Sequence, residues 1–501
     1  MTTRELPRLT AAALPGLPPG SGPRVPPCDL AIGIVHLGMG AFHRAHQAVL
    51  TEDAMAVTGD HRWGICAVTQ RSAVQRDLLV AQEGLCSMLV RQPSGSTARV
   101  VGALRRVLDG TREEAEVAAA LADPAVRVVT ITVTERGYRV APATGELLAD
   151  DPDVAADAAG LAPAQTLVGR LAEGLEERRR RGSGPITVVS CDNLPGNGRL
   201  LAAAMRDFLE LAGDRYRELR AWSADYVAFP STMVDRLVPA ADEADRATVS
   251  ELLGVDDRAV VVTEPEAQWV IQDHFTSERP EWEAAGARIV PDVEPFEVMK
   301  LRMLNGSHTA LAYLGLLSGE RSVAGAIAAP TVRHAVEVLM DELSRSLVIP
   351  PGVDLADYRA SLMRRFENSA LPDRLERIAS DGSQKLRPRL LAAAGELKAA
   401  GIRSVLVPIV FAAWAVALIR EADHDGRSFE VRDPLPRRPR RTADPVEIQA
   451  GVDALLGRAD IVPSSLLGDR EFASDVRRAA TVLLGGPTRS ALITVLESSR
   501  R

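Results

Sequence analysis

The sequence predicts an α/β domain built on a parallel sheet, followed by a mainly α-helical domain. In the first part of the chain, short apolar runs suited to buried parallel strands alternate with helical segments, as in open α/β folds. In the second part, from about residue 294, the apolar positions repeat with the period of a helix and no convincing strand is found. The chain has 501 residues, which is long enough for two such domains.

Four segments of the first domain are predicted strands, because each is a short apolar run and one of them is strongly β-branched. They span residues 29–38, 63–69, 126–134 and 185–193. Helical segments such as residues 40–57 and 164–181 separate them. We expect this domain to cover residues 29–293. Residues 1–28, which are rich in proline and glycine, are expected to form a disordered or extended lead-in.

The second domain is expected to cover residues 294–501. Its predicted helices span residues 294–315, 331–347, 388–400 and 405–422. The longest apolar run, Val405 to Ile419, is fifteen residues long and contains Pro408. Such a run is too short to span a bilayer, so a buried helix is the better interpretation.

Composition favours a cytoplasmic enzyme with a small-molecule substrate, acting without membrane or nucleic acid. The net charge is −8, and the basic runs at residues 178–181 and 437–441 are interpreted as a solvated helix end and a surface loop. Four scattered cysteines form no C-x-x-C pair, so their spacing supplies no metal site. The first ten residues lack the apolar core of a signal peptide.

A glycine turn follows the first predicted strand in V-H-L-G-M-G-A-F-H-R-A-H-Q (35–47). Gly38 and Gly40 match the first two glycines of a dinucleotide-binding fingerprint, and they stand between a strand and a helix as that fingerprint requires. The third position is His43, so the helix is expected to sit slightly differently on the sheet. Arg44 is a candidate for supporting phosphate charge. The alternative is an ordinary strand-to-helix turn with surface His and Arg side chains.

The segment E-P-F-E-V-M-K-L-R-M-L-N-G-S-H-T (294–309) is the more informative one. At about 100° per residue, His308 lies about 80° and Asn305 about 140° from Lys300 around a helix, so all three can face one cavity. A lysine on an apolar helix loses solvation, which favours its neutral form and makes it a candidate general base. The competing interpretation is an amphipathic helix with a polar edge.

Asn193 follows a predicted strand in C-D-N-L-P-G-N-G (191–198). Open α/β sheets bind ligands at the carboxyl ends of their strands, and an amide there can donate a hydrogen bond to a developing alkoxide. The alternative is a common Asn and Gly turn.

Six segments together resemble the mannitol 2-dehydrogenase family of polyol-specific long-chain dehydrogenases. That family also contains arabinitol dehydrogenases and the fructuronate and tagaturonate reductases. The segments are G-M-G-A-F-H-R-A-H-Q (38–47), T-V-T-E-R-G-Y (132–138), C-D-N-L-P-G-N-G (191–198), F-P-S-T-M-V-D-R-L (229–237), K-L-R-M-L-N-G-S-H (300–308) and L-E-R-I-A-S-D-G-S-Q-K (375–385). They run over most of the chain.

The resemblance implies a Rossmann-type domain and a zinc-independent, nicotinamide-dependent oxidation of a secondary alcohol. It assigns Lys300 as general base, Asn193 and Asn305 as the pair that stabilises the oxyanion, and His308 as the group that orients the substrate. It implies that the Glu297 carboxylate controls the release of the substrate proton from Lys300 to solvent. Further substrate contacts are implied for Arg377 and Lys385, with Asp235 near the site. The cofactor contacts are implied for Gly38, Met39, Gly40, Ala41, Phe42, Arg44, Thr134 and Glu135.

Two departures from the family pattern bear on cofactor and substrate. The second strand ends in T-Q-R-S (69–72), where relatives that prefer NAD often carry an acid, so NAD is expected without excluding NADP. Ser231 stands where many relatives have Asn.

D-mannitol to D-fructose is the first substrate hypothesis, with D-mannonate to D-fructuronate or an arabinitol as alternatives. A uronate carboxylate would need a cation, and Arg377 or Lys385 suits either substrate. A nucleotide-sensing regulator without chemistry is the hypothesis from another class. The resemblance favours a monomer.

Overall fold

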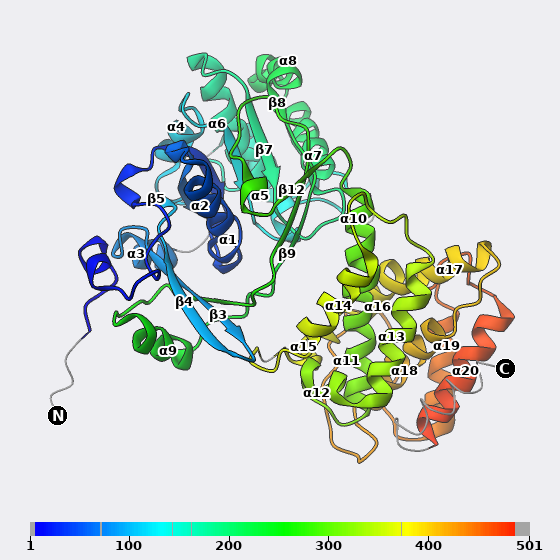
Figure 1. Ribbon diagram of the computed structural model, residues 1–501. Coiled ribbons are helices and arrows are strands. Elements are labelled where there is room, and N and C mark those ends of the chain that lie inside the picture. The colour runs from blue at the N-terminus through cyan, green and yellow to red at the C-terminus, as the bar shows by residue number, and fades with distance from the viewer. Residues whose placement is uncertain (1–5, 71–72, 143, 162, 372, 486–501) are drawn as a thin grey trace. The chain divides into compact units, whose positions relative to one another are not determined.

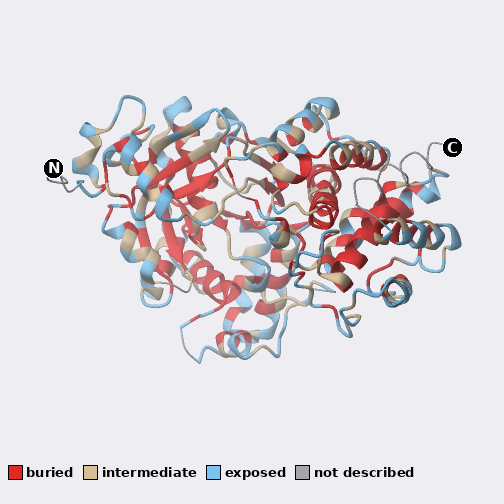
Figure 2. Cartoon of the chain, turned by 90° about the horizontal axis from the view of Figure 1, so that it is seen from below, coloured by how far each residue is buried: buried red, intermediate tan, exposed pale blue. Residues whose placement is uncertain are grey.

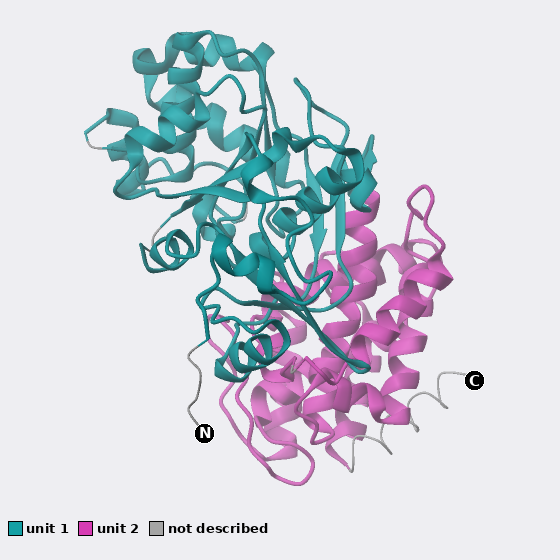
Figure 3. Ribbon diagram, turned by 60° about the vertical axis from the view of Figure 1, so that its left-hand side comes forward, with its two compact units in different colours: residues 1–294 teal, residues 295–501 magenta. Residues whose placement is uncertain are grey.

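The computed structural model describes residues 6–70, 73–142, 144–161, 163–371 and 373–485. The chain divides into two compact units, Met1–Glu294 and Pro295–Arg501, which Figure 3 draws in two colours. Each unit has its own core and is described by itself.

A six-stranded sheet organises unit 1 (Figure 1). Its strands are β1 (Ile32–Leu37), β2 (Gly64–Thr69), β5 (Leu104–Asp109), β6 (Val128–Ile131), β7 (Ile186–Ser190) and β8 (Val227–Ala228). The order is β5-β2-β1-β6-β7-β8, and every neighbouring pair is parallel. The strand order reverses between β1 and β6, the position where open α/β sheets bind dinucleotides. The predicted Rossmann-type sheet is confirmed.

Alternate residues of each strand face two different cores, because successive side chains point to opposite faces of a sheet. Ile34 of β1 belongs to a core that includes residues of α1 (Ala41–Ala45) and α2 (Gln47–Thr58). Val35 belongs to the other core, which helices α4, α6, α7 and α8 supply. They span Glu114–Leu121, Leu167–Arg181, Asn197–Leu211 and Arg217–Tyr226. In Figure 2 the strands between these layers are mostly buried.

Two small sheets of unit 1 were not predicted. One joins the antiparallel hairpin β3 (Cys86–Gln92) and β4 (Gly95–Val101) to β10 (Val261–Thr263). The other contains β9 (Thr232–Asp235), β11 (Gln268–Gln272) and β12 (Arg288–Val290). Strands β9, β10, β11 and β12 are short, with three to five residues each. Much of β4 is polar and partly exposed, so no apolar run marks it. The remaining helices are α3 (Ala73–Val80), α5 (Pro152–Ala159), α9 (Glu243–Leu253) and the 3-10 turns η3 to η6 (His61–Trp63, Glu135–Tyr138, Gly213–Tyr216, Trp282–Ala285).

The proline-rich start of the chain, expected to be a disordered or extended lead-in, packs against the rest of unit 1 over its described part. It contains the 3-10 turns η1 (Ala11–Gly16) and η2 (Pro27–Asp29). Leu9 and Val25 are both almost completely buried. Burial of these two apolar side chains offsets the entropy lost on ordering, which the prolines already reduce.

Helices joined by loops make up the described part of unit 2. Its helices are α10 (Glu294–Met299), α11 (Ser307–Leu317), α12 (Val323–Ala328), α13 (Pro330–Ser344), α14 (Leu355–Phe366), α15 (Leu375–Ile378), α16 (Gly382–Leu386), α17 (Ala392–Ala399), α18 (Leu406–Arg420), α19 (Pro445–Leu456) and α20 (Arg470–Leu484). Two π-helical segments, η7 (Lys300–Gly306) and η8 (Arg387–Leu391), interrupt the α-helical geometry. The predicted helix at residues 388–400 is therefore π-helical over its first residues.

Helix α18 forms the centre of unit 2 and contacts α11, α13, α19 and α20. Every residue from Leu406 to Ile419 is buried, which confirms the buried-helix interpretation of the longest apolar run. Within the described part of the chain, we find no helix with the length and apolar character needed to cross a membrane.

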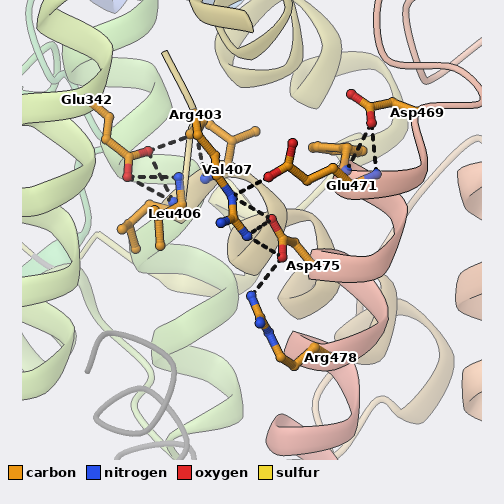
Figure 4. A network of polar contacts seen from close by, with 11 residues as sticks. Glu342, Arg403, Leu406, Val407, Asp469, Glu471, Asp475 and Arg478 are labelled. Carbon is orange, nitrogen blue, oxygen red and sulfur yellow. Dashed lines mark hydrogen bonds and ion pairs between the residues drawn. The ribbon is translucent and has the colours of Figure 1, made fainter. Parts of the chain in front are cut away.

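The start of α18 is held by the polar network in Figure 4. The Glu342 carboxylate accepts hydrogen bonds from the backbone N–H groups of Val405 (2.9 Å) and Leu406 (3.1 Å), so it satisfies donors that have no partner within the helix. Beside it, Arg403 pairs with Asp475 of α20 at 2.7 Å. These contacts fix the start of the apolar helix while its sides fill the core.

Candidate active site

The two glycines of the turn after β1 have different structural roles. Gly38 has φ +98°, and a Cβ on it would stand 2.1 Å from the carbonyl oxygen of Thr132. Gly40 has an extended backbone, and a Cβ on it would meet no protein atom closer than 3.8 Å. The fold therefore requires Gly38, whereas Gly40 leaves open space of the kind that lets a pyrophosphate approach the backbone. The turn fits a dinucleotide cofactor on this ground.

His43 takes the place of the third fingerprint glycine by stacking on His36 of β1. The two rings are nearly parallel, with centroids 3.3 Å apart, and both side chains are fully buried. His36 is held by the hydroxyls of Thr130 (2.8 Å) and Thr132 (3.0 Å). Burial lowers the pKa of His36 to about 3, so the rings pack as neutral groups. A flat ring thus provides the close contact of helix and strand that glycine usually allows.

Arg44 is buried and directed at protein carbonyls. Its Nε donates to Gly40 O (3.3 Å) and its Nη1 to Ala259 O. Arg236 similarly donates to Ala45 O (2.6 Å). These two guanidinium groups brace α1, which positions the glycine turn.

Thr134 and Glu135 lie exposed in the loop after β6. Thr134 has φ +71°, a strained conformation for a residue with a side chain. The buried carboxylate of Asp192 holds it, accepting from Val133 N (3.1 Å), Thr134 N (2.9 Å) and Tyr138 Oη (2.8 Å). Sequence reasoning missed Asp192; the signal was an acid directly after a buried strand.

Asn193 follows Asp192 and is exposed at the end of β7. The turn that carries it is fixed by Asn197, whose amide donates to Asp192 O (2.9 Å) and to Thr232 O (3.0 Å). Thr232 N donates back to Asn197 Oδ1 (2.8 Å). Thr232 begins strand β9, which ends at Asp235, so one amide ties the Asn193 turn to the segment bearing Asp235.

At the end of β2 the side chain of Gln70 accepts a hydrogen bond from Arg170 of α6. Arg71 and Ser72, which raised the question of NADP, lie outside the described residues.

Lys300 is buried at the start of the π-helical segment η7, with 6% of its surface exposed. The α-helix expected from the sequence would put Lys300 and Asn305 about 140° apart, but this segment is π-helical. A π-helix closes its hydrogen bonds between residues five apart, so Asn305 lies about one turn from Lys300 on the same side. His308 follows in α11, where its ring lies 4.9 Å from that of Phe366. Glu297 precedes Lys300 in α10 and is half-buried.

The second π-helical segment, η8, packs against η7. Arg389 of η8 donates through Nη1 to Thr309 Oγ1 (3.1 Å) and Asn305 O (3.4 Å). Sequence reasoning missed this residue. Lys385, in α16, donates to Ser380 O (2.6 Å), and Arg377 of α15 donates to Asp373 (2.6 Å).

The predicted residues thus fall into two sets. Unit 1 carries the glycine turn, the Thr134 loop, Asn193 and Asp235, and unit 2 carries Lys300, Asn305, His308, Glu297, Arg377 and Lys385. Over the described residues, no group of three or more His, Cys, Asp or Glu side chains is placed to hold a metal ion.

A Rossmann-type sheet with this glycine turn, joined in one chain to a helical unit with a buried lysine, defines a dehydrogenase of the dinucleotide-dependent class. Two family models match nearly the whole chain. The mannitol dehydrogenase Rossmann domain matches residues 32–284, and the mannitol dehydrogenase C-terminal domain matches residues 292–483. The chain belongs to the mannitol dehydrogenase family, as the sequence resemblance indicated.

Relatives within this family differ in their substrates. The chain is 36% identical over 475 residues to a mannitol 2-dehydrogenase of Pyrenophora tritici-repentis, covering 93% of this chain and 81% of that protein. It is 37% identical over 451 residues to a D-mannonate oxidoreductase of Escherichia coli, covering 89% and 92%. Among solved structures it is similar to the Pseudomonas fluorescens mannitol 2-dehydrogenase complex with NAD and D-mannitol, with 34% identity, a TM-score of 0.82 and coverage of 98% and 99%.

Proposed function

We propose that this protein is an NAD-dependent dehydrogenase that oxidises a secondary hydroxyl group of an open-chain polyol or sugar acid to a ketone, and catalyses the reverse reduction. The observation that carries the proposal is the buried Lys300, one π-helical turn from Asn305, in a chain that matches both family models. The open space at Gly40 supports a dinucleotide in unit 1.

In this mechanism Lys300 removes the proton of the substrate hydroxyl as its carbon is oxidised. The cofactor, when bound, supplies the hydride acceptor. Asn193 and Asn305 donate amide N–H groups to the oxygen as it gains negative charge, and this replaces the role of a metal ion. His308 holds a substrate hydroxyl, and Glu297 accepts the proton from Lys300 on its way to solvent.

The Gly38–Arg44 turn, with Thr134 and Glu135, would hold the cofactor. Whether NAD is preferred over NADP is measured by the ratio of kcat/KM with each. The end of β2 at Gln70 offers no carboxylate to bind the ribose hydroxyls of NAD, so we expect a smaller preference for NAD than an acid at this position gives.

Two substrates are candidates. D-mannitol, oxidised to D-fructose, is the neutral candidate, and D-mannonate, oxidised to D-fructuronate, is the acidic one. Turnover of a panel of polyols and aldonates, followed by absorbance of the reduced nicotinamide, tests the proposal. Cofactor binding without turnover on any member of the panel would refute it and support a nucleotide-sensing regulator.

A further inference from the structure

Arg389 is a cation beside the reacting segment that lacks an anionic partner among the described residues. Its hydrogen bonds run from Nη1 to the Thr309 hydroxyl and the Asn305 carbonyl, both on the segment that carries Lys300. No described carboxylate lies within ion-pair distance of its guanidinium group. Burial lowers the pKa of Arg389 to about 10. Partial burial of a charge without a counter-ion is costly, because the charge loses solvation that nothing replaces.

Three other basic side chains near this segment have carboxylate partners. Arg377 pairs with Asp373 (2.6 Å), and Lys385 lies 3.8 Å from Asp381. Arg302 of η7 pairs with Glu396 (2.6 Å). Arg389 differs from these three side chains because no described carboxylate pairs with it. Arg377 and Lys385, the cations that the sequence suggested for a substrate acid, already have carboxylate partners. Arg387, which is exposed, has no described carboxylate partner either and donates to Ala459 O (3.3 Å).

The chemistry of Arg389 suits a carboxylate. A guanidinium group has five N–H donors in a fixed fork, and only Nη1 contacts the described part of the protein, so Nε and Nη2 keep donors for a ligand. The pKa of Lys385 is lowered by its burial and by the charge of Arg389. A bound anion would relieve both this repulsion and the cost of burying Arg389, whereas an uncharged polyol would relieve neither.

We propose that Arg389 binds the carboxylate of the substrate, and that this protein prefers sugar acids of the aldonate and keto-uronate class to uncharged polyols. The inference rests on the proposed dehydrogenase function and adds the substrate class. The carboxylate of an open-chain aldonate lies several bonds from the oxidised carbon. Arg389 contacts η7 from the neighbouring segment η8, so it can bind this carboxylate while Lys300 and Asn305 contact the hydroxyl group of the carbon that is oxidised.

The test compares D-mannonate and D-mannitol as substrates of the wild type and of Arg389→Gln, Arg389→Lys and Arg387→Gln. Arg387 is the matched control, because it is exposed, two residues away and on the same segment. We expect wild-type kcat/KM to be higher for D-mannonate. In Arg389→Gln, kcat/KM for D-mannonate should fall about 30- to 100-fold further than kcat/KM for D-mannitol, the range of a lost hydrogen-bonded charge contact, because only the acid loses a direct contact. Arg389→Lys keeps the positive charge but loses the planar set of N–H donors, so its loss of activity on D-mannonate should be intermediate. Arg387→Gln should have the kinetic constants of the wild type.

Two results would overturn the inference: a wild-type preference for D-mannitol, or an equal loss of both substrates in Arg389→Gln with folding and NADH fluorescence binding unchanged. If Arg389→Gln does not fold, the same comparison of D-mannonate and D-mannitol is made with Arg389→Lys, and an equal loss of both substrates again overturns the inference. Calorimetric titration of D-mannonate into the NADH complex of Lys300→Ala, with and without Arg389→Gln, measures binding without turnover. This separates the two proposals: a catalytically normal Lys300→Ala refutes the assigned base, whereas Arg389-independent binding refutes the acid site.

Discussion

The glycine turn of unit 1 and the lysine segment of unit 2 both leave regular geometry where the chemistry is expected, but for different reasons. At the turn, Gly38 adopts φ +98° against the Thr132 carbonyl, a position that only glycine fits. In η7 the residues K-L-R-M-L-N-G are mostly ordinary helix formers, yet the segment is π-helical. The irregularity at Gly38 is visible in the sequence as a glycine, whereas no residue type in η7 marks its π-helical geometry.

The two regions are also held differently. The turn is fixed by backbone contacts to neighbouring strands, since Gly38 N and Met39 N both donate to Val68 O at 3.0 Å. The lysine segment is held by side chains, with Arg302 bonded to Glu396 and to Ser346 O (2.7 Å) and Arg389 contacting Asn305. Changes at Gly38 should therefore affect folding first, and changes in the lysine segment should affect catalysis first.

The largest expected effect is on the catalytic side. Lys300→Ala should lower kcat by about 10²- to 10⁴-fold, the usual contribution of a positioned general base. NADH affinity should stay nearly unchanged, since the proposed cofactor contacts lie in unit 1. Added primary amines should partly restore turnover. The measurement is steady-state kinetics on the best substrate, with and without amine.

Lys398→Ala is the matched control, because Lys398 is an exposed lysine of unit 2 that pairs with Asp469 at 2.6 Å. It should keep wild-type kcat. Near-normal turnover in Lys300→Ala would show that Lys300 is not the general base. The lysine segment would then have no demonstrated catalytic role to set against the folding role of Gly38.

On the folding side, Gly38→Ala should lower the free energy of unfolding by about 3 kcal/mol or more, from backbone strain together with overpacking against Thr132. Urea denaturation measures it. Gly59→Ala is the control, because Gly59 also has positive φ (+73°) but a Cβ on it would meet no atom within 4 Å. It should cost about 1 kcal/mol. Equal losses in the two variants would mean that contact with Thr132 is not the reason for glycine at position 38.

A buried carboxylate in α2, the helix that follows the glycine turn, should make the free energy of unfolding depend on pH. Glu52 of α2 is fully buried and accepts from Arg24 N (2.9 Å) and Gly102 N (2.5 Å). Burial raises the pKa of Glu52 to about 7, from an ordinary value of 4.5. Between these values the unfolded chain loses its proton before the folded protein does, so stability falls as pH rises. The loss is of order 3 kcal/mol across this window and is complete above about pH 7.

Glu52→Gln removes the titrating group, so its stability should change much less over the same range. Urea midpoints from about pH 5 to about pH 8 compare the two proteins. Parallel curves would exclude Glu52 as the source of the slope.

The same distinction explains which parts of the molecule the sequence predicted. Strands β1, β2, β6 and β7 are continuous apolar runs buried on both faces, and all four were predicted close to their bounds. The β3–β4 hairpin was missed because β4 is partly exposed and polar. The pattern of apolar residues along the chain indicates which segments are buried, so partly exposed strands are hard to predict from it.

For the candidate site, the residue types were visible but their surroundings were not. Glycines after a strand and a lysine on an apolar helix carry their own physical argument. The roles of Asp192 and Arg389 depend on partners distant in sequence, Val133 for one and Asn305 for the other. The π-helical geometry of η7 is not marked by its residue types, so α-helical spacing applied to residues 300–308 gives the wrong angle between Lys300 and Asn305.

The smallest expected effect on folding is at the second glycine. Gly40→Ala adds a Cβ that meets nothing closer than 3.8 Å, on a backbone that alanine adopts freely, so stability should change by no more than about 0.5 kcal/mol. If that space is where the pyrophosphate approaches, NADH should bind about tenfold more weakly, measured by fluorescence titration. Gly38 and Gly40, two residues apart, would then divide the turn into a folding position and a ligand position. Unchanged NADH affinity in Gly40→Ala would instead place the cofactor away from this glycine.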